Sequence, residues 1–272
     1  MDSFLSAFFS GTAQGAIYAL VSLGLVLVWR GAGVVNFAQM GQAMFTTYIA
    51  SQLIQNNYSY WSAFVIALIS GAILGAVVDL GLMRPLTSRK NSQLLNSQSM
   101  RTTIPVIASL GILAILQALA GVFWAGEERG FPTPVDNFYF KNGAGTLPFS
   151  AFNLFVIGVV LIVLLLLTYF FTQTGVGLGM RAAALNPEVA RLSGIKVSRM
   201  RTLSWTISGA AGSLAGLLIT PSTNLSPNTL DLILIIAFTA AVVGGLDSPL
   251  GAVIGGLMLG IGIASGLDKT LV

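Results

Sequence analysis

The 272-residue sequence contains no cysteine and no histidine, and only 8% of its residues are charged. The missing cysteines exclude disulfide bridges and thiol nucleophiles, and the two absences together remove the commonest protein ligands of zinc and haem. Without histidine, the chain also lacks the side chain that usually transfers protons near neutral pH. We therefore expect no catalytic residue, no metal site and no nucleic-acid partner.

Charge is also too scarce for a soluble protein of this length. Soluble domains carry roughly 25% charged residues, whereas this chain is 55% hydrophobic. A transmembrane helix needs about 20 mostly apolar residues. The candidate segments are 4–29, 33–53, 61–83, 104–124, 151–171, 202–220, 231–246 and 249–267. The sequence thus predicts an all-α integral membrane protein of about eight transmembrane helices, with residues 1–272 forming a single domain.

The last two segments are separated only by a short turn, Gly244-Gly245-Leu246-Asp247-Ser248-Pro249, so they could form two spans or one re-entrant hairpin. Small residues recur within the spans, and they let helix backbones approach closely where lipid offers no hydrophobic driving force. We expect such close packing at Gly11 and Gly15, Gly71 and Gly75, Gly209 to Gly216, and Gly251 to Gly262.

The distribution of basic residues predicts the orientation. The loops 84–103 and 172–201 are basic, and together with Arg30 they hold ten of the thirteen Lys and Arg residues. The loop 125–150 mixes both signs, with Arg129, Lys141, Glu127, Glu128 and Asp136. Because basic loops stay in the cytoplasm, we expect the first two loops inside and the third outside. Counting spans backwards places the N-terminus outside.

One short cytoplasmic helix is bracketed by its own caps. Asn186 is a good N-cap, Pro187 suits the first helical position, and Glu188 complements the helix dipole. Arg191 follows one turn along, and Gly194 provides a left-handed stop. These residues predict a helix over 187–193 whose apolar edge is Val189, Leu192 and Ile195.

A helix this short is marginal in water, so it must dock on something. One interpretation is a coupling helix that inserts into a cytosolic ATPase. The other is an interfacial helix that lies on the inner leaflet and is held there by arginines.

Several motifs, in order along the chain, resemble those of one family. They are Tyr18-Ala19-Leu20 with Leu23-Gly24-Leu25, Asn36-Phe37-Ala38, Arg84-Pro85-Leu86, the stretch from Gly179 to Ile195 with its core Arg181-Ala-Ala-Ala-Leu-Asn-Pro-Glu-Val-Ala-Arg-Leu-Ser-Gly-Ile195, and Gly244-Gly245-x-x-Ser248-x-x-Gly251. This pattern is similar to that of the LivH/LivM family, the permeases of branched-chain amino acid ABC importers. Members of the family usually carry a further hydrophobic segment after the Gly-rich region, whereas this sequence ends at Val272.

The resemblance implies three kinds of protein partner in addition to membrane lipid. They are cytosolic ABC ATPase subunits, a second LivM-like permease or a copy of this chain, and an extracytoplasmic substrate-binding protein. It assigns the coupling surface to Asn186, Pro187, Glu188, Val189, Arg191, Leu192, Gly194 and Ile195. The sequence has no G-x-x-x-x-G-K-[ST] loop, so no cofactor is expected in this chain, and ATP and Mg would be bound by the partner subunits.

A candidate substrate path lies where the second segment begins, at Asn36, Phe37, Gln39 and Gln42. Amides are costly in hydrocarbon, so they should face other helices or a wet cavity. They could bind a polar solute, or they could hydrogen-bond between helices without touching it. The family often has His-Gly where Gln39-Met40 stand, a departure that bears on any substrate role of Gln39.

We therefore expect a permease subunit of an ATP-driven importer in a prokaryotic cell (inner) membrane, most simply for branched-chain or other neutral amino acids. The same machinery could import urea, short amides or small aromatic acids. An ion-coupled secondary transporter would place acids in mid-membrane, whereas Asp79, Asp231 and Asp247 lie near segment ends. Asp79 should pair with Arg84 or reach the membrane interface.

Overall fold

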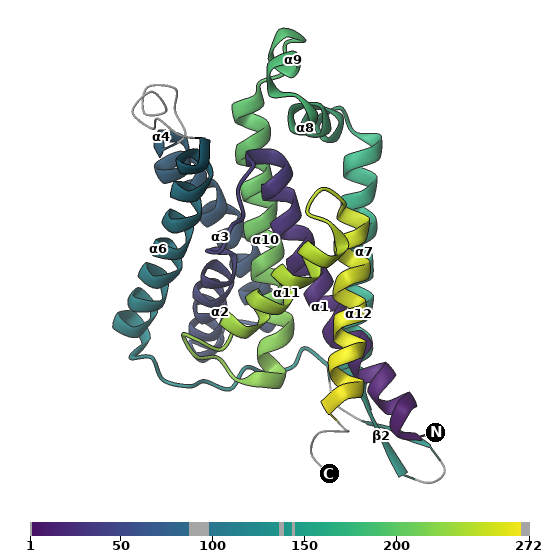
Figure 1. Cartoon of the computed structure of the whole chain (residues 1–272). Helices are drawn as coiled ribbons and strands as arrows, with labels where there is room; N and C mark the ends of the chain where they lie inside the picture. Colours follow the sequence, from purple (N-terminus) through teal and green to yellow (C-terminus); the bar gives the residue numbers. More distant parts are fainter. Residues whose placement is uncertain (1, 87–97, 136–138, 143–144, 268–272) are drawn as a thin grey trace.

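The computed structural model describes residues 2–86, 98–135, 139–142 and 145–267 (Figure 1). The first half of the chain forms α1 (Asp2–Ala32), α2 (Gln39–Gln55), α3 (Tyr60–Val78), the π-helical turn η1 (Asp79–Met83), α4 (Arg84–Leu86) and α6 (Gln98–Trp124). Of the residues in the predicted loops, Arg89, Lys90 and Asp136 lie outside the described ranges.

The second half begins with a two-stranded antiparallel hairpin, β1 (Tyr139–Asn142) and β2 (Gly145–Ser150). Helices α7 (Ala151–Gln173), α8 (Gly175–Leu185), α9 (Pro187–Leu192), α10 (Val197–Thr223), α11 (Asp231–Gly244) and α12 (Pro249–Leu267) follow. In Figure 1, α8 and α9 lie at one end of the bundle, whereas the hairpin, the start of α1 and the end of α12 lie at the other. We refer to these as the α9 end and the hairpin end.

Among the described residues, six helices are long and apolar enough to cross a membrane. They lie within α1, the α3–α4 stretch, α6, α7, α10 and α12. The two other predicted segments are the shorter helices α2 and α11, of 17 and 14 residues. At 1.5 Å per residue these reach about 25 and 21 Å, less than the roughly 30 Å of a hydrocarbon core. Both are shorter than predicted because non-helical backbone precedes each of them.

The turn between α11 and α12 lies at the α9 end. Gly245 adopts φ +93°, a conformation that favours glycine. Asp247 then accepts a hydrogen bond from the indole of Trp29 at 3.1 Å, close to where α1 ends. The two helices are therefore an antiparallel pair, in which α12 is long enough to cross a membrane and α11 is not.

Helices α1 and α10 form the centre of the bundle. In their membrane-length windows, 89% and 72% of the residues are buried within the chain, against 11% in α7. Close glycine crossings hold this centre together. A Cβ at Gly15 of α1 would lie 2.9 Å from the Cα of Leu257 in α12, and one at Gly71 of α3 would lie 2.7 Å from the carbonyl oxygen of Gly209 in α10. The predicted glycine packing is confirmed at these crossings.

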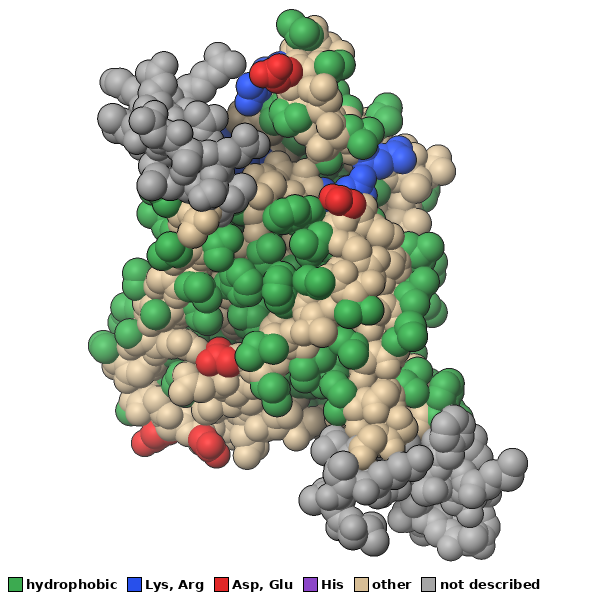
Figure 2. Space-filling view, viewed as in Figure 1, with side chains coloured by type: hydrophobic (Ala, Val, Ile, Leu, Met, Phe, Trp, Pro, Cys, Tyr) green, Lys and Arg blue, Asp and Glu red, His purple; other side chains and the backbone are tan. Residues whose placement is uncertain are grey.

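The outer helices present large apolar side chains to the surroundings. Ile73 of α3, Val122 of α6 and Leu165 of α7 are each more than half exposed. Figure 2 shows hydrophobic side chains across the middle of one face of the molecule, with charged side chains mostly towards its two ends. This distribution suits a protein whose middle contacts hydrocarbon and whose ends contact water.

Candidate functional site

Two adjoining helices, α8 and α9, form an elbow at the α9 end. The predicted loop 172–201 contained one short helix, and the structure adds α8 before it. Thr174 caps α8 by accepting a hydrogen bond from the backbone N–H of Gly177 at 3.0 Å. Met180 and Ala183 bury one side of α8, whereas Leu178 is 60% exposed. The Thr174 cap was the sequence signal for α8, and the sequence interpretation missed it.

The caps of α9 are those that the sequence predicted. The Asn186 side chain accepts hydrogen bonds from the backbone N–H groups of Glu188 and Val189, each at 3.1 Å. Gly194 adopts φ +83°, and the next N–H, of Ile195, donates to the carbonyl of Ala190 at 2.9 Å. This is a glycine-terminated helix end of the Schellman type. The observed helix, Pro187–Leu192 with Ser193 as C-cap, matches the predicted 187–193 within one residue.

The predicted apolar edge of α9 is largely exposed. Val189 is 55% and Leu192 is 89% exposed, and Leu185 just before α9 is 84% exposed. Ile195 is half-buried, and Glu188, Arg191 and Pro187 are exposed. Ala190 is the side chain that faces the bundle, at 2% exposure. Figure 1 shows α9 projecting beyond α8, away from the rest of the chain.

An ionic cluster fixes the start of α10, just after the elbow. The Asp79 carboxylate is fully buried and pairs with the Arg201 guanidinium at 2.8 Å and with Arg84 at 3.4 Å. Thr202 donates to the same carboxylate at 2.6 Å. Arg84 also donates to the Ser198 carbonyl at 3.0 Å. The expected Asp79–Arg84 pair is thus present, and sequence reasoning missed Arg201, which lies 122 positions away from Asp79 along the chain (201 − 79).

The predicted substrate-path residues lie at an interruption between α1 and α2. Residues 33–38 are not helical, and α2 begins only at Gln39. The Gln39 side chain donates to the carbonyl of Val21 at 3.1 Å and accepts from the Ser208 hydroxyl at 3.0 Å. Val21 and Ser208 lie near the middle of α1 and α10, so α2 starts about halfway across the bundle. We call residues 33–38 the α2 break.

Gln39 is fully engaged by other helices. Its two amide atoms are bonded to α1 and α10, and a Cβ at Gly24 would lie 2.5 Å from its Nε2 atom. These contacts correspond to the alternative of hydrogen bonding between helices. A further turn along α2, Thr46 lies 2.7 Å from the Ser213 hydroxyl of α10.

Asn36 and Gln42 differ from Gln39. Both side chains are fully buried, and among the described residues none of their four amide atoms has a hydrogen-bond partner. Between them, Phe37 is partly exposed; its ring lies 5.3 Å from that of Phe238 in α11, and its N–H donates to the Ser109 hydroxyl at 3.3 Å. The break therefore places unpaired amides beside aromatic rings at mid-height.

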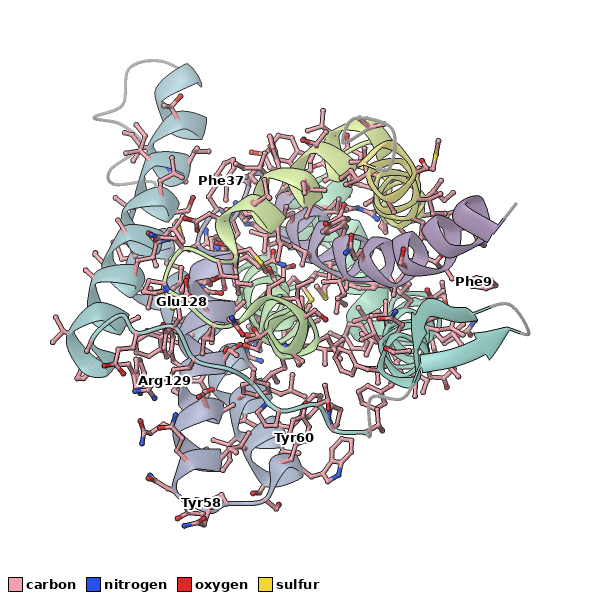
Figure 3. All side chains as sticks on the ribbon, turned by 90° about the horizontal axis from the view of Figure 1, so that it is seen from below. Phe9, Phe37, Tyr58, Tyr60, Glu128 and Arg129 are labelled. Carbon is pink, nitrogen blue, oxygen red and sulfur yellow. The ribbon has the colours of Figure 1, made fainter. Side chains whose placement is uncertain are left out.

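The hairpin end carries the segment that follows α6. The backbone of Arg129 exchanges two hydrogen bonds with Leu225, at 2.9 and 2.8 Å, and its guanidinium donates to Gln52 and Gln55 of α2, each at 3.3 Å. Tyr48 donates to the carbonyl of Glu127 at 3.2 Å. Figure 3, seen from this end, shows the segment with Glu128 and Arg129 crossing it towards the hairpin. The far end of α2 is thereby closed.

These features define a multi-pass helical membrane protein with a discontinuous helix at mid-height, an arrangement typical of solute transporters. The family model described as "Branched-chain amino acid transport system / permease component" matches residues 7–270. The chain belongs to this family, which confirms the resemblance found in the sequence. It is a permease component of an ABC transporter, a non-catalytic subunit, and family membership implies ATPase and binding-protein partners in general.

Three relatives illustrate the range of the family. The chain is 34% identical to the probable branched-chain amino acid transport permease LivH of Methanocaldococcus jannaschii, over 90% of this chain and 75% of the relative. It is 28% identical to the high-affinity branched-chain amino acid permease BraD of Pseudomonas aeruginosa, over 97% and 87%. It is 30% identical to the xylose transport permease XylH of Escherichia coli, over 92% and 56%. No solved structure matches the chain.

Proposed function

We propose that this permease imports a branched-chain or other neutral amino acid, driven by ATP hydrolysis in partner subunits that grip α9. The observation that carries the proposal is the elbow, where a helix of less than two turns is closed by its own caps and exposes Leu192 and Val189 to the surroundings. An exposed apolar edge on such a short helix is stable only in contact with something else.

The orientation supports a cytosolic partner rather than a periplasmic one. At the α9 end lie Arg30, Arg84, Arg181, Arg191, Lys196, Arg199 and Arg201, whereas Arg129 lies at the hairpin end. Since basic residues stay on the cytoplasmic side, we assign the α9 end to the cytoplasm and the N-terminus to the outside. The binding protein would then deliver solute at the hairpin end.

The contacts of α10 provide a path from the elbow to the α2 break. Movement of α9 is transmitted through the Gly194 turn to α10, whose start is held by the Asp79 cluster. Farther along, α10 contacts α2 closely, because a Cβ at Gly212 would lie 3.0 Å from the Gln39 side chain. A shift of α10 would therefore reposition α2 and open or close the break.

The break suits a small solute that is polar at one part and apolar at another. Asn36 and Gln42 offer unpaired donors and acceptors, and burying such groups without partners costs free energy that a bound solute could offset. Phe37 and Phe238 offer apolar contact to a side chain. These features favour a neutral amino acid. Urea, short amides and small aromatic acids are the second candidates, since they share part of this chemistry.

The coupling role is tested in proteoliposomes that contain the complete transporter with its ATPase subunits, second permease and binding protein. Leu192→Ser removes an apolar contact to the ATPase, so we expect roughly tenfold slower uptake at a given rate of ATP hydrolysis. Leu178→Ser, which changes a similarly exposed leucine on α8, serves as the control. Equal uptake by both variants and the unaltered chain would contradict the coupling role.

The solute and the energy source are tested separately. Calorimetry on the partner binding protein should detect leucine or a similar neutral amino acid and should not detect urea. Uptake should persist after proton and sodium gradients are collapsed and should stop without ATP. Uptake that follows an ion gradient instead would contradict the proposed energy source.

A further inference from the structure

A lateral cavity of about 510 Å³ lies away from both features described above. Its floor is α1, its two sides are α7 and α12, and α8 covers its α9 end; we call it the α7–α12 groove. Its walls include Leu27, Leu161, Leu165, Leu250 and Val253, with Arg30 and Arg181 also lining it.

The groove opens towards the hydrocarbon rather than into the bundle. Leu161, Leu165 and Leu250 on its rims are 56%, 61% and 70% exposed, and they lie on helices that otherwise present apolar side chains outwards. Along α7 the lining extends from Leu161 to Thr172, about 16 Å of helix. This matches the roughly 15 Å depth of one leaflet's hydrocarbon.

The interior of the groove offers no hydrogen bonds of its own. The hydroxyls that line it are used within their helices, because Thr168 donates to Leu164, Thr172 to Thr168 and Ser204 to Met200. An occupant of the long part of the groove must therefore be apolar.

The two arginines lie at the end of the groove nearest α9. Arg30 is in the last turn of α1, and Arg181 comes from α8. Both are partly buried, and among the described residues neither forms an ion pair with a carboxylate. The Arg181 Nε atom is buried without a hydrogen-bond partner, and Asp247 is bonded to Trp29 instead. Two partly desolvated cations thus have no anion.

We infer that the α7–α12 groove binds an anionic phospholipid, with an acyl chain along α7 and the headgroup phosphate between Arg30 and Arg181. An apolar channel of one leaflet's depth that ends in two unpaired guanidinium groups matches the two parts of such a lipid. Arginine binds phosphate oxygens with paired N–H donors, and basic pockets between transmembrane helices bind anionic headgroups in this way.

The test measures lipid retained on the full-length chain by native mass spectrometry, with phosphatidylglycerol and phosphatidylcholine of identical acyl chains as probes. We expect the unaltered chain to prefer phosphatidylglycerol. The double variant Arg30→Gln/Arg181→Gln should bind it roughly 25-fold more weakly, since each basic residue near the headgroups contributes about a fivefold preference. The control Arg191→Gln/Arg199→Gln removes the same charge from exposed positions outside the groove and should keep the preference. Equal retention of both lipids by the unaltered chain, or equal loss in both double variants, would overturn the inference.

A second variant tests the acyl-chain part without touching the arginines. Leu165→Trp adds bulk to an exposed rim position, so the fold should persist while phosphatidylglycerol retention falls. Retention that is unchanged in this variant would overturn the inference. An excess of inorganic phosphate should leave the lipid bound, and displacement by phosphate would instead indicate a simple anion site.

The remaining occupant to test is another polypeptide over the groove. Because the sequence contains no cysteine, Leu250→Cys creates a single reactive thiol on the groove rim. In membranes containing the complete transporter we expect this thiol to react with a lipid-soluble maleimide. A cross-link to a second copy or to another subunit in place of that reaction would overturn the inference.

Discussion

The chain interrupts its helices in two different ways, at the elbow around α9 and at the α2 break. The elbow is held by near neighbours, since the Asn186 side chain caps N–H groups two and three positions away. The break is held by distant residues, because its bonds reach Val21, Ser109 and Ser208, which lie 18, 72 and 169 positions from their partners. A locally held helix can move as a unit, whereas the break changes only when the helices around it move.

The largest expected effect is at the junction between the two regions. Asp79→Asn leaves Arg201, and in part Arg84, without its carboxylate, and breaking a buried ion pair costs about 3 kcal/mol of unfolding free energy. We expect a clearly lower thermal unfolding midpoint in detergent. Glu128→Gln, at an exposed carboxylate, should shift it little. Equal midpoints for the two variants would show that α10 is not anchored through Asp79.

The α2 break should respond differently at two glutamines of the same helix. Gln39→Leu leaves the Ser208 hydroxyl and the Val21 carbonyl buried without partners, which should cost about 2 kcal/mol of unfolding free energy. Gln42→Leu removes two amide atoms that have no partner among the described residues, so stability should be unchanged or higher by about 1 kcal/mol. Solute uptake should nevertheless fall in the Gln42 variant.

Thermal unfolding of both variants, with uptake measured in parallel, checks this contrast. A Gln42→Leu chain that is as unstable as Gln39→Leu would mean that Gln42 is engaged structurally, and would remove it from the substrate path.

At the elbow the effect should be smaller and local. Asn186→Ala removes the N-cap of α9, at a cost of about 1 kcal/mol to that helix. Hydrogen exchange at the amides of Glu188 and Val189 should become roughly fivefold faster, while the unfolding midpoint of the bundle stays the same. Asn186→Asp preserves the cap and should restore slow exchange. A drop in the midpoint of the whole bundle would contradict a locally held elbow.

The smallest effect on stability is expected at the tip of α9. Leu192 is 89% exposed, so Leu192→Ser should change the unfolding free energy of the isolated chain by less than about 0.5 kcal/mol. A larger loss in the isolated chain would mean that Leu192 packs against its own subunit. Its effect should appear only when the ATPase subunits are present.

Sequence patterns predicted the features whose causes lie close together in the chain. The apolar segments, the caps of α9 at Asn186 and Gly194, and the amides near the start of α2 were all readable, because hydrophobic length, capping and turn chemistry act over a few residues. The glycine spacing also predicted close helix packing, although it did not say which helices meet.

The tertiary structure alone decided which distant side chains meet. Arg201 joins Asp79 and Arg84, Gln39 is bonded to two other helices while Gln42 is not, and Arg30 and Arg181 converge on one groove. Each of these outcomes depends on the rotation and depth of helices relative to one another. Those quantities follow from packing across the whole bundle, and no local stretch of sequence encodes them.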